Sequence, residues 1–261
     1  MDSTPTFDDG VAYERFMGRW SRAAGEAFLD WIRPSTGCRW LDVGCGGGAF
    51  TELVFASCSP AAVCGIDPAK AQVGYARAGP VGKRAEFRVA AAEKLPFPDA
   101  SFDIVTSALV INFIPDRPKA LLEMRRVARV GGLVAGYVWD FAGERSVLSP
   151  IRLAMQRIGR QPPRSAGAED STLEQLAALF RHVGLTNIAT KPIDIRVTYP
   201  DFHDFWRAQT PSFNPLTQAI AALSHGDRAE IVDLVKEAVG TPDGSIVYSA
   251  RANAIMARVP N

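Results

Sequence analysis

The chain of 261 residues is predicted to fold as an α/β protein, with a parallel sheet covered by helices on both faces. Two observations support this class. Short apolar runs alternate with segments of helical periodicity across residues 39–138. One of these runs ends in a glycine-rich loop at 44–48, and Asp42 stands two residues before the first glycine. Such a loop typically joins a strand to a helix where backbone groups approach a ligand.

The first half of the chain contains five predicted strands separated by helices. The strands are expected at 39–43, 63–66, 85–90, 102–106 and 133–138, and the helices between them at 50–57, 69–77 and 116–129. Asp116 is expected to cap the last of these helices, and Gly131-Gly132 to stop it. Before the sheet, residues 11–32 are predicted to form one or two helices that end at Pro34.

The second half has a more polar and less regular pattern. We expect helices near 149–158, over 176–183 behind a capping box at 171–174, and across 201–239 with breaks at Pro211 and Pro215, and strands over 193–197 and 248–254. The whole pattern predicts N-terminal helices at 1–36 that cover a binding site, and an α/β domain at 37–261. Within that domain we expect a mainly helical cap at 201–240 and a loop-and-helix excursion at 140–170.

Composition narrows the class of function. The formal net charge is +1 with charges interspersed, which disfavours a nucleic-acid partner. No apolar run is long enough to span a bilayer, and the polar N-terminus has no signal-peptide core, so we expect no membrane partner and a cytoplasmic location. The four cysteines lack Cys-x-x-Cys spacing and the three histidines are far apart, so we predict free thiols and no metal site.

Two carboxylates indicate the kind of ligand. Asp67 ends the second apolar run, nineteen residues after Gly48, where it could hold both hydroxyls of a ribose. Asp42 would repel a dinucleotide's pyrophosphate but would favour the ammonium group of an amino acid. The usual Tyr-x-x-x-Lys pair of short-chain dehydrogenases is also missing. These features predict an adenosine-containing cofactor that carries an amino-acid portion.

With Leu95-Pro96-Phe97 after the third strand, these residues resemble the class I S-adenosylmethionine-dependent methyltransferases, in particular the small-molecule group similar to methyltransferase type 11. The resemblance covers about 39–137, and with fewer matching residues it extends to 13–21 and the last strand. It implies a Rossmann-like, doubly wound, seven-stranded and mostly parallel sheet with a helical lid insertion. The last strand would be antiparallel and would lie beside the fifth, with the ligand at the carboxyl ends of the strands.

The resemblance also implies roles for particular residues in binding S-adenosyl-L-methionine, whose product would be S-adenosyl-L-homocysteine. The methionine portion would be held by Asp42, Gly44, Gly46, Ala108, Leu109 and Arg19, the ribose by Asp67, and the adenine by Pro68, Ala92 and Glu93, with Tyr13 lying over the cofactor. Relatives often carry Asp where this chain has Ala91, so the adenine contact would come from backbone, water or Glu93.

The implied activity is methyl transfer to a small-molecule acceptor by in-line displacement from the sulfonium. Alignment and exclusion of water would supply most of the catalysis, and a general base is needed only if the acceptor must lose a proton. Asp140 and His203 are the candidates for such a base. Two alternatives stay open, an NAD(P)-dependent Rossmann reductase and a catalytically silent protein that binds S-adenosylmethionine. The sequence leaves a monomer and a homodimer equally open.

Overall fold

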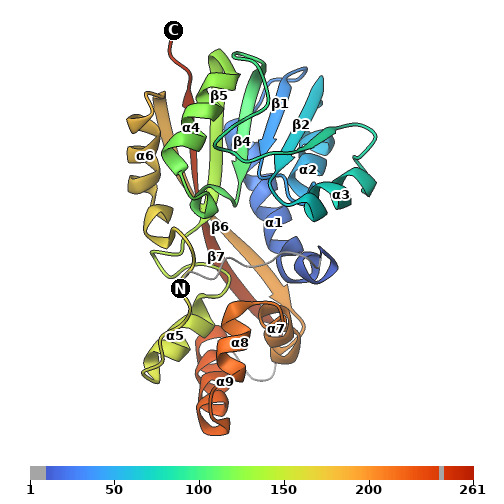
Figure 1. Ribbon diagram of the computed structural model, residues 1–261. Helices are drawn as coiled ribbons and strands as arrows, with labels where there is room; N and C mark the ends of the chain where they lie inside the picture. Colours follow the sequence, from blue (N-terminus) through green and yellow to red (C-terminus); the bar gives the residue numbers. More distant parts are fainter. Residues whose placement is uncertain (1–9, 241–243) are drawn as a thin grey trace.

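A seven-stranded sheet forms the centre of the computed structural model, which describes residues 10–240 and 244–261 (Figure 1). Its strands are β1 (Arg39–Val43), β2 (Ala62–Asp67), β3 (Glu86–Val89), β4 (Phe102–Ala108), β5 (Ala128–Trp139), β6 (Thr186–Tyr199) and β7 (Ile246–Arg258). The strand order is β3-β2-β1-β4-β5-β7-β6, and β7 pairs antiparallel with both β5 and β6. The predicted seven-stranded sheet with an antiparallel last strand beside the fifth is therefore confirmed.

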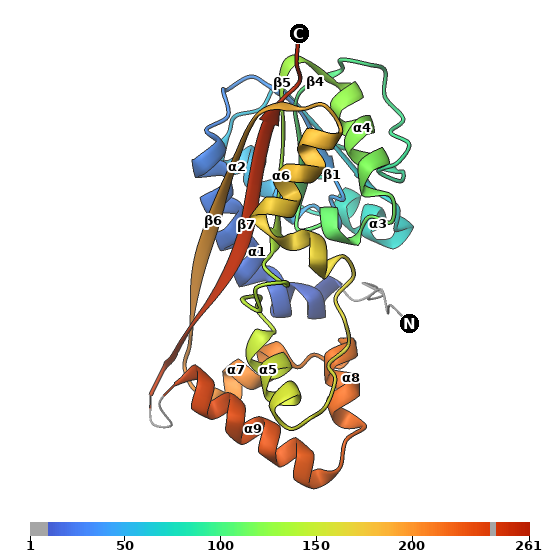
Figure 2. The same cartoon turned by 90° about the vertical axis from the view of Figure 1, so that its left-hand side faces the viewer.

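Helices cover both faces of this sheet. The α-helices are α1 (Gly10–Ile32), α2 (Ala49–Ser57), α3 (Lys70–Ala78), α4 (Arg117–Val127), α5 (Ser149–Arg157), α6 (Leu173–His182), α7 (Phe202–Gln209), α8 (Pro215–Ala221) and α9 (His225–Val239), with 3₁₀ turns η1 (Ile111–Phe113) and η2 (Ala168–Ser171). Figure 2 shows α1 and α2 on one side of the sheet and α4 on the other. No helix in the described ranges combines the length and apolarity needed to cross a membrane.

Side chains of β5 alternate between the two faces of the sheet, so this strand contributes to the core on both sides. Leu133 and Tyr137 pack with residues of α1 and α2, whereas Val134 and Val138 pack with residues of α4 and α6. Successive side chains of a strand point to opposite faces, so a strand buried on both sides reads as a nearly continuous apolar run. This is the run that the sequence shows before Trp139.

Several predicted boundaries were wrong, and the strands predicted at 133–138, 193–197 and 248–254 extend to Ala128–Trp139, Thr186–Tyr199 and Ile246–Arg258. The helix that begins after Asp116 ends at Val127 and not at 129, and Gly131-Gly132 lies inside β5. There the chain pairs with its own C-terminal segment, since Gly131 N donates to Val259 O at 2.9 Å and Val259 N donates to Gly132 O at 3.0 Å. The helix expected over 176–183 begins at Leu173, and its cap is Thr172, whose side chain accepts from Gln175 N.

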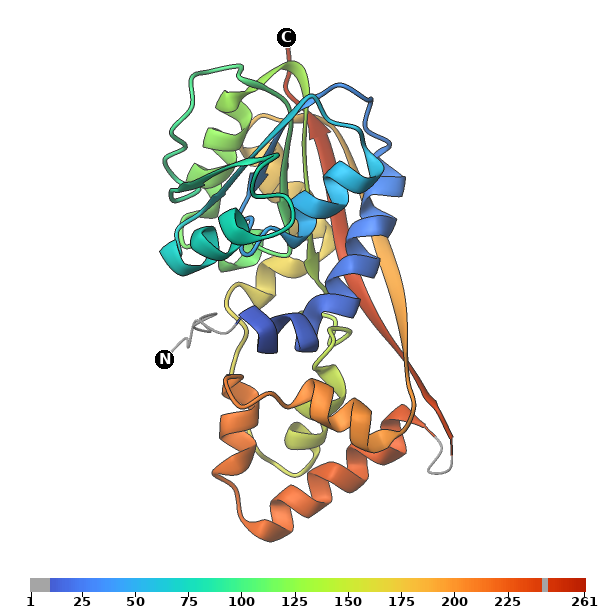
Figure 3. The ribbon, with the colours of Figure 1, turned by 90° about the vertical axis from the view of Figure 1, so that its right-hand side faces the viewer.

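The helices α7, α8 and α9 connect β6 to β7, and together with α5 they lie beyond one end of the sheet (Figures 2 and 3). Helix α1 is continuous and packs against β6 and α7. The junction is held by the phenol oxygen of Tyr199, which accepts from Trp20 Nε1 at 2.9 Å and from Gln209 Nε2 at 3.0 Å. All three side chains are buried. The N-terminal helix, the last strands and α7 are thus tied through one hydroxyl group.

Candidate cofactor site

The glycine loop follows β1 and is held against β2. Gly44 N and Cys45 N donate to the carbonyl oxygen of Ile66 at 2.8 and 2.9 Å. Gly44 has φ +78°, and a Cβ at that position would lie 2.5 Å from Val110 Cγ1. Only glycine combines this backbone conformation with so close an approach. Because Val110 follows β4, the loops after β1 and β4 are in contact.

Asp67 joins the end of β2 to the glycine loop. Its Oδ2 accepts from Gly46 N at 3.0 Å, and its Oδ1 accepts from Ala69 N at 2.8 Å. Burial raises the pKa of Asp67, while these two backbone N–H groups act in the opposite direction. Each carboxylate oxygen has two lone pairs, so both can still accept from a ligand hydroxyl.

Asp42 is completely buried beneath the loop. Its Oδ2 accepts from Thr51 Oγ1 of α2 at 2.7 Å, whereas its Oδ1 has no hydrogen-bond partner in the described structure. Burial, together with a smaller contribution from the charge of Asp67, raises the pKa of Asp42 to about 7, although the hydrogen bond from Thr51 acts in the opposite direction. A fully buried acceptor without a partner is uncommon and suggests that a donor is supplied from outside the chain.

The segment after β4 forms the other side of this edge. Ala108 and Leu109 are partly buried, and Leu109 N donates to Tyr137 O of β5 at 2.8 Å. Leu109 has φ +61°, in the left-handed region that a branched side chain seldom occupies. Such strain persists only where surrounding contacts enforce it, and it is often found at binding sites.

The loop after β3 is fixed from the neighbouring helix α4. Ala92 is buried in the core, and Glu93 Oε1 lies 3.5 Å from the Asp116 N that donates to it. The Arg126 guanidinium donates to the carbonyl oxygens of Leu95 and Phe97, at 3.1 and 2.8 Å. The loop expected to flank the adenine is therefore held in place by hydrogen bonds between its backbone carbonyl groups and the side chain of Arg126.

Four other predicted site residues have different surroundings. Arg19 is exposed on α1, with its guanidinium 5.5 Å from the Tyr199 ring and 3.9 Å from the Asp204 carboxylate. Asp140 is buried at the end of β5 and accepts from Gly143 N at 2.9 Å, a contact that caps the following turn. His203 is exposed on α7, and Pro68 is exposed after β2. The side chain of Tyr13 lies outside the described residues.

Sequence reasoning missed three contacts at this edge. They are the hydrogen bond of Thr51 to Asp42, the packing of Val110 on Gly44, and the packing of the Tyr75 ring on Gly47. A Cβ on Gly47 would lie 2.9 Å from Tyr75 Cδ1, so this half-exposed ring from α3 lies against the loop. Thr51 carried a usable signal, because a threonine in the first turn of the following helix can reach back to the strand.

These residues fit an adenosyl amino acid. The buried, unpartnered oxygen of Asp42 suits an ammonium group, and the carboxylate of Asp67 suits the ribose hydroxyls. The loop between them presents glycine backbone, and a Cβ would collide with a neighbouring side chain at Gly44 and at Gly47. No group of three metal-ligating side chains occurs among the described residues.

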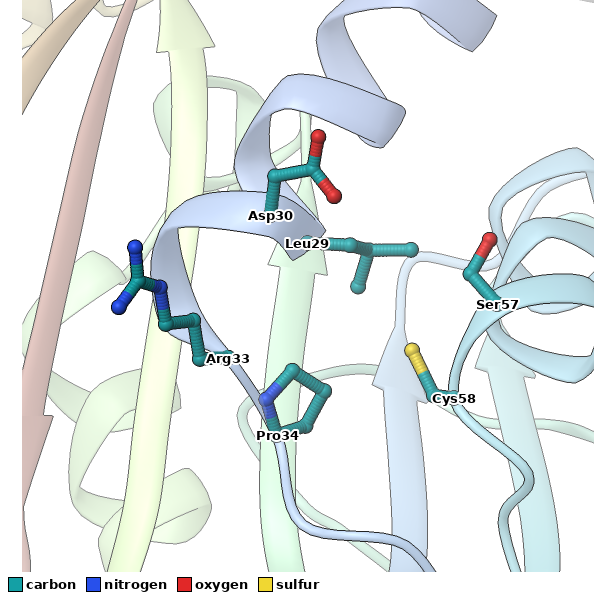
Figure 4. A pocket seen from close by; sticks show the side chains of 6 residues that line it. All are labelled: Leu29, Asp30, Arg33, Pro34, Ser57 and Cys58. Carbon is teal, nitrogen blue, oxygen red and sulfur yellow. The ribbon is translucent and has the colours of Figure 1, made fainter.

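A surface hollow of about 540 Å³ lies at the opposite edge of the sheet, and Figure 4 shows the six side chains that line it. They come from the end of α1 and the chain that follows it, and from the end of α2: Leu29, Asp30, Arg33, Pro34, Ser57 and Cys58. This hollow adjoins the amino ends of β1 and β2, so it is separate from the glycine loop. None of the predicted site residues lines it.

Known proteins with similar sequences are named as methyltransferases. Residues 41–136 match the family model described as a methyltransferase domain. The malonyl-[acyl-carrier protein] O-methyltransferase of Erwinia pyrifoliae is 34% identical over 156 residues, which cover 60% of this chain and 56% of that protein. The chain spans about half the length of the Erwinia protein and of two other curated relatives that it matches.

Two solved structures share the fold. A phosphoethanolamine N-methyltransferase 2 of Haemonchus contortus, in complex with phosphomonomethylethanolamine and S-adenosylhomocysteine, has a TM-score of 0.59 at 20% identity, covering 98% of this chain and 58% of that one. The [4+2]-cyclase SpnF has a TM-score of 0.56 at 20% identity, covering 92% of this chain and 81% of that one. The second structure carries a name from a different reaction class, so the fold alone does not specify the reaction.

Proposed function

Because the chain belongs to the class I S-adenosylmethionine-dependent methyltransferases, we propose that it transfers a methyl group from S-adenosylmethionine to a small-molecule acceptor. The observation that carries this proposal is the pair of carboxylates around the glycine loop. Asp67 binds the Gly46 amide, and Asp42 keeps one buried oxygen free. A dinucleotide would place anionic phosphates beside Asp42, which disfavours the reductase alternative.

The chain's own residues would act by binding and orientation. When bound, the cofactor supplies a methyl group activated by the positive charge of its sulfonium. Asp42 would accept from the ammonium group and Asp67 from the ribose hydroxyls, which fixes the two ends of the ligand. Ala108 and Leu109, at the carboxyl end of β4, would exclude water from the methionine side. Holding donor and acceptor in line can supply much of the rate acceleration without a general base.

The acceptor is proposed to be a small molecule that approaches from the side of the helices between β6 and β7. The first relative is named for an acyl group on a carrier protein, so an acceptor attached to a carrier is the related possibility. Asp140 and His203 stay candidates for a base. The turn contact of Asp140 limits its freedom, and the exposure of His203 leaves it free to move.

Calorimetry with S-adenosylhomocysteine tests cofactor binding directly. We expect micromolar binding by the native protein, no comparable binding of NADPH, and a loss of about tenfold or more in affinity for Asp67→Ala. Asp103→Ala is the matched control, because Asp103 lies at the amino end of β4 and pairs with Arg129. Equal affinity of Asp67→Ala and the native protein would refute the assignment.

Turnover separates an enzyme from a silent binder. The protein is incubated with S-adenosylmethionine and a small-molecule extract, and formation of S-adenosylhomocysteine above the rate without extract is measured. An increase that disappears in Asp67→Ala supports methyl transfer. Binding without turnover in extracts from several sources would favour the silent alternative.

A further inference from the structure

Asn112 carries one of the buried side-chain oxygens that have no hydrogen-bond partner in the described structure. The residue lies in η1, just after β4, and is 2% exposed. Its Nδ2 donates to Ala166 O at 3.0 Å, whereas its Oδ1 has no partner. A buried acceptor left unpaired destabilises the folded protein, so its retention calls for a physical reason.

The orientation of this amide is fixed by its partner. Asn112 faces a backbone carbonyl, which can only accept, so the nitrogen must point toward Ala166 and the oxygen must point away. Rotating the amide would place two acceptors against each other. The unpaired atom is therefore an accepting oxygen, and its partner must be an O–H or N–H donor.

The place of Asn112 in the fold identifies the ligand region. The strand order reverses between β1 and β4, and open α/β sheets bind ligands at this switch point. The glycine loop follows β1, and Val110, two residues before Asn112, packs on Gly44 of that loop. On the other side, the ring of Phe113 lies 6.4 Å from that of Phe141, which follows β5. Asn112 thus stands in the chain between Val110, which packs on the cofactor loop, and Phe113, whose ring lies near the segment after β5.

A second set of contacts holds Asn112 in position. The guanidinium of Arg117 donates to the Asn112 carbonyl oxygen at 3.2 Å and forms an ion pair with Asp170. A Cβ on Gly167 would collide with the same carbonyl oxygen. The segment 166–170 therefore encloses the backbone of Asn112 and leaves the side-chain oxygen as its free polar atom.

We propose that Asn112 Oδ1 accepts a hydrogen bond from the O–H or N–H group of the methyl acceptor, and so positions the acceptor's nucleophile. This proposal rests on the proposed function. The ammonium group of the cofactor is assigned to Asp42, whose charge is the better partner for a cation. A neutral amide oxygen suits a neutral donor, so the predicted acceptor carries a hydroxyl or an uncharged amine at the reacting end.

The test compares two probes that differ in one donor. Phenol and anisole share a ring, but only phenol carries an O–H group. Their affinities are measured by calorimetry for the protein saturated with S-adenosylhomocysteine. We expect the native complex to bind phenol about tenfold more tightly than anisole, and the ratio to fall to about one in Asn112→Leu, which has nearly the same shape.

Arg117→Met is the matched control. It loosens the same segment by removing the Asp170 ion pair and leaves Asn112 Oδ1 in place. The preference for phenol should survive in this variant. If it is lost there as fully as in Asn112→Leu, Asn112 has only a structural role.

The remaining outcomes are distinguishable. If the native protein does not bind S-adenosylhomocysteine, the proposed function fails. If it binds but does not prefer phenol to anisole, the proposal for Asn112 is overturned and the proposed function stands. If Asn112→Leu weakens S-adenosylhomocysteine itself by more than about fivefold, the oxygen serves the cofactor, which also overturns the proposal. A crystal structure showing only a water on Oδ1 in the presence of phenol would do the same.

Discussion

Replacing Asp42 by asparagine should stabilise the protein without ligand, and increasingly so as the pH rises. The carboxyl group is fully buried, and its pKa is raised from 3.8 to about 7. Between these values the folded state binds a proton that the unfolded state has released. The free energy of unfolding must therefore fall as the pH rises through this window. Asparagine does not titrate, so Asp42→Asn lacks this loss.

The size of the effect follows from the two pKa values of Asp42. At about 1.4 kcal/mol per pKa unit, the raised pKa corresponds to roughly 4 kcal/mol of lost stability at alkaline pH. Part of this loss is already present at pH 5. We expect the advantage of Asp42→Asn to grow by about 2–3 kcal/mol between pH 5 and pH 8.

Urea denaturation at pH 5, 6, 7 and 8 measures this difference, with the native protein and the variant compared at each pH. Asp103→Asn is the control, because the Arg39 amide and the Arg129 guanidinium hold the pKa of Asp103 below its usual value. That variant should be less stable than the native protein by an amount that stays constant from pH 5 to pH 8. An advantage of Asp42→Asn that is flat or shrinks with pH would refute the reasoning.

Two further predictions use thermal or chemical denaturation, and a third uses calorimetry with S-adenosylhomocysteine. Gly44→Ala should lower the free energy of unfolding by about 1–3 kcal/mol, because the φ of Gly44 is +78° and the new Cβ would collide with Val110. Gly74→Ala is the control, because a Cβ there meets open space on α3, and it should raise the free energy of unfolding by up to about 1 kcal/mol. Tyr199→Phe removes the acceptor of two buried donors and should lower the free energy of unfolding by about 2–4 kcal/mol, whereas no loss would show that the junction is held by packing alone. Arg126→Met should weaken S-adenosylhomocysteine severalfold, since it frees the loop after β3, and unchanged affinity would exclude that loop from the site.

The sheet could be predicted from the sequence because its strands are apolar runs of short length between glycine, proline and capping signals. The cap at Asp116 was recognisable for the same reason, since its side chain accepts from Lys119 N. The start of β5 could not be predicted in this way. Within its early part, Gly131 and Gly132 pair with Val259, more than a hundred residues away, and local sequence carries no sign of that partner.

In the candidate site, too, some features follow from local sequence and others depend on distant parts of the chain. The carboxylates and the glycine loop were identified from spacing, because a strand places its last residues at a known edge. The unpaired oxygens of Asp42 and Asn112 could not be foreseen, since they depend on which nearby groups already have partners. The position of Arg19 near Asp204 was also beyond prediction, because it depends on how α7 packs on α1.

The paired strands β6 and β7 extend beyond the rest of the sheet. Only Ala252–Arg258 of β7 pair with β5, while the pairing with β6 continues to Ile246. The far half of this strand pair is therefore a two-stranded arm that carries α7–α9 (Figure 2). Adding two residues to each strand would move these helices outward by roughly 7 Å and keep every side chain on its face. The space that we propose for the methyl acceptor could thus be lengthened or shortened during evolution, while the residues around the glycine loop stay unchanged.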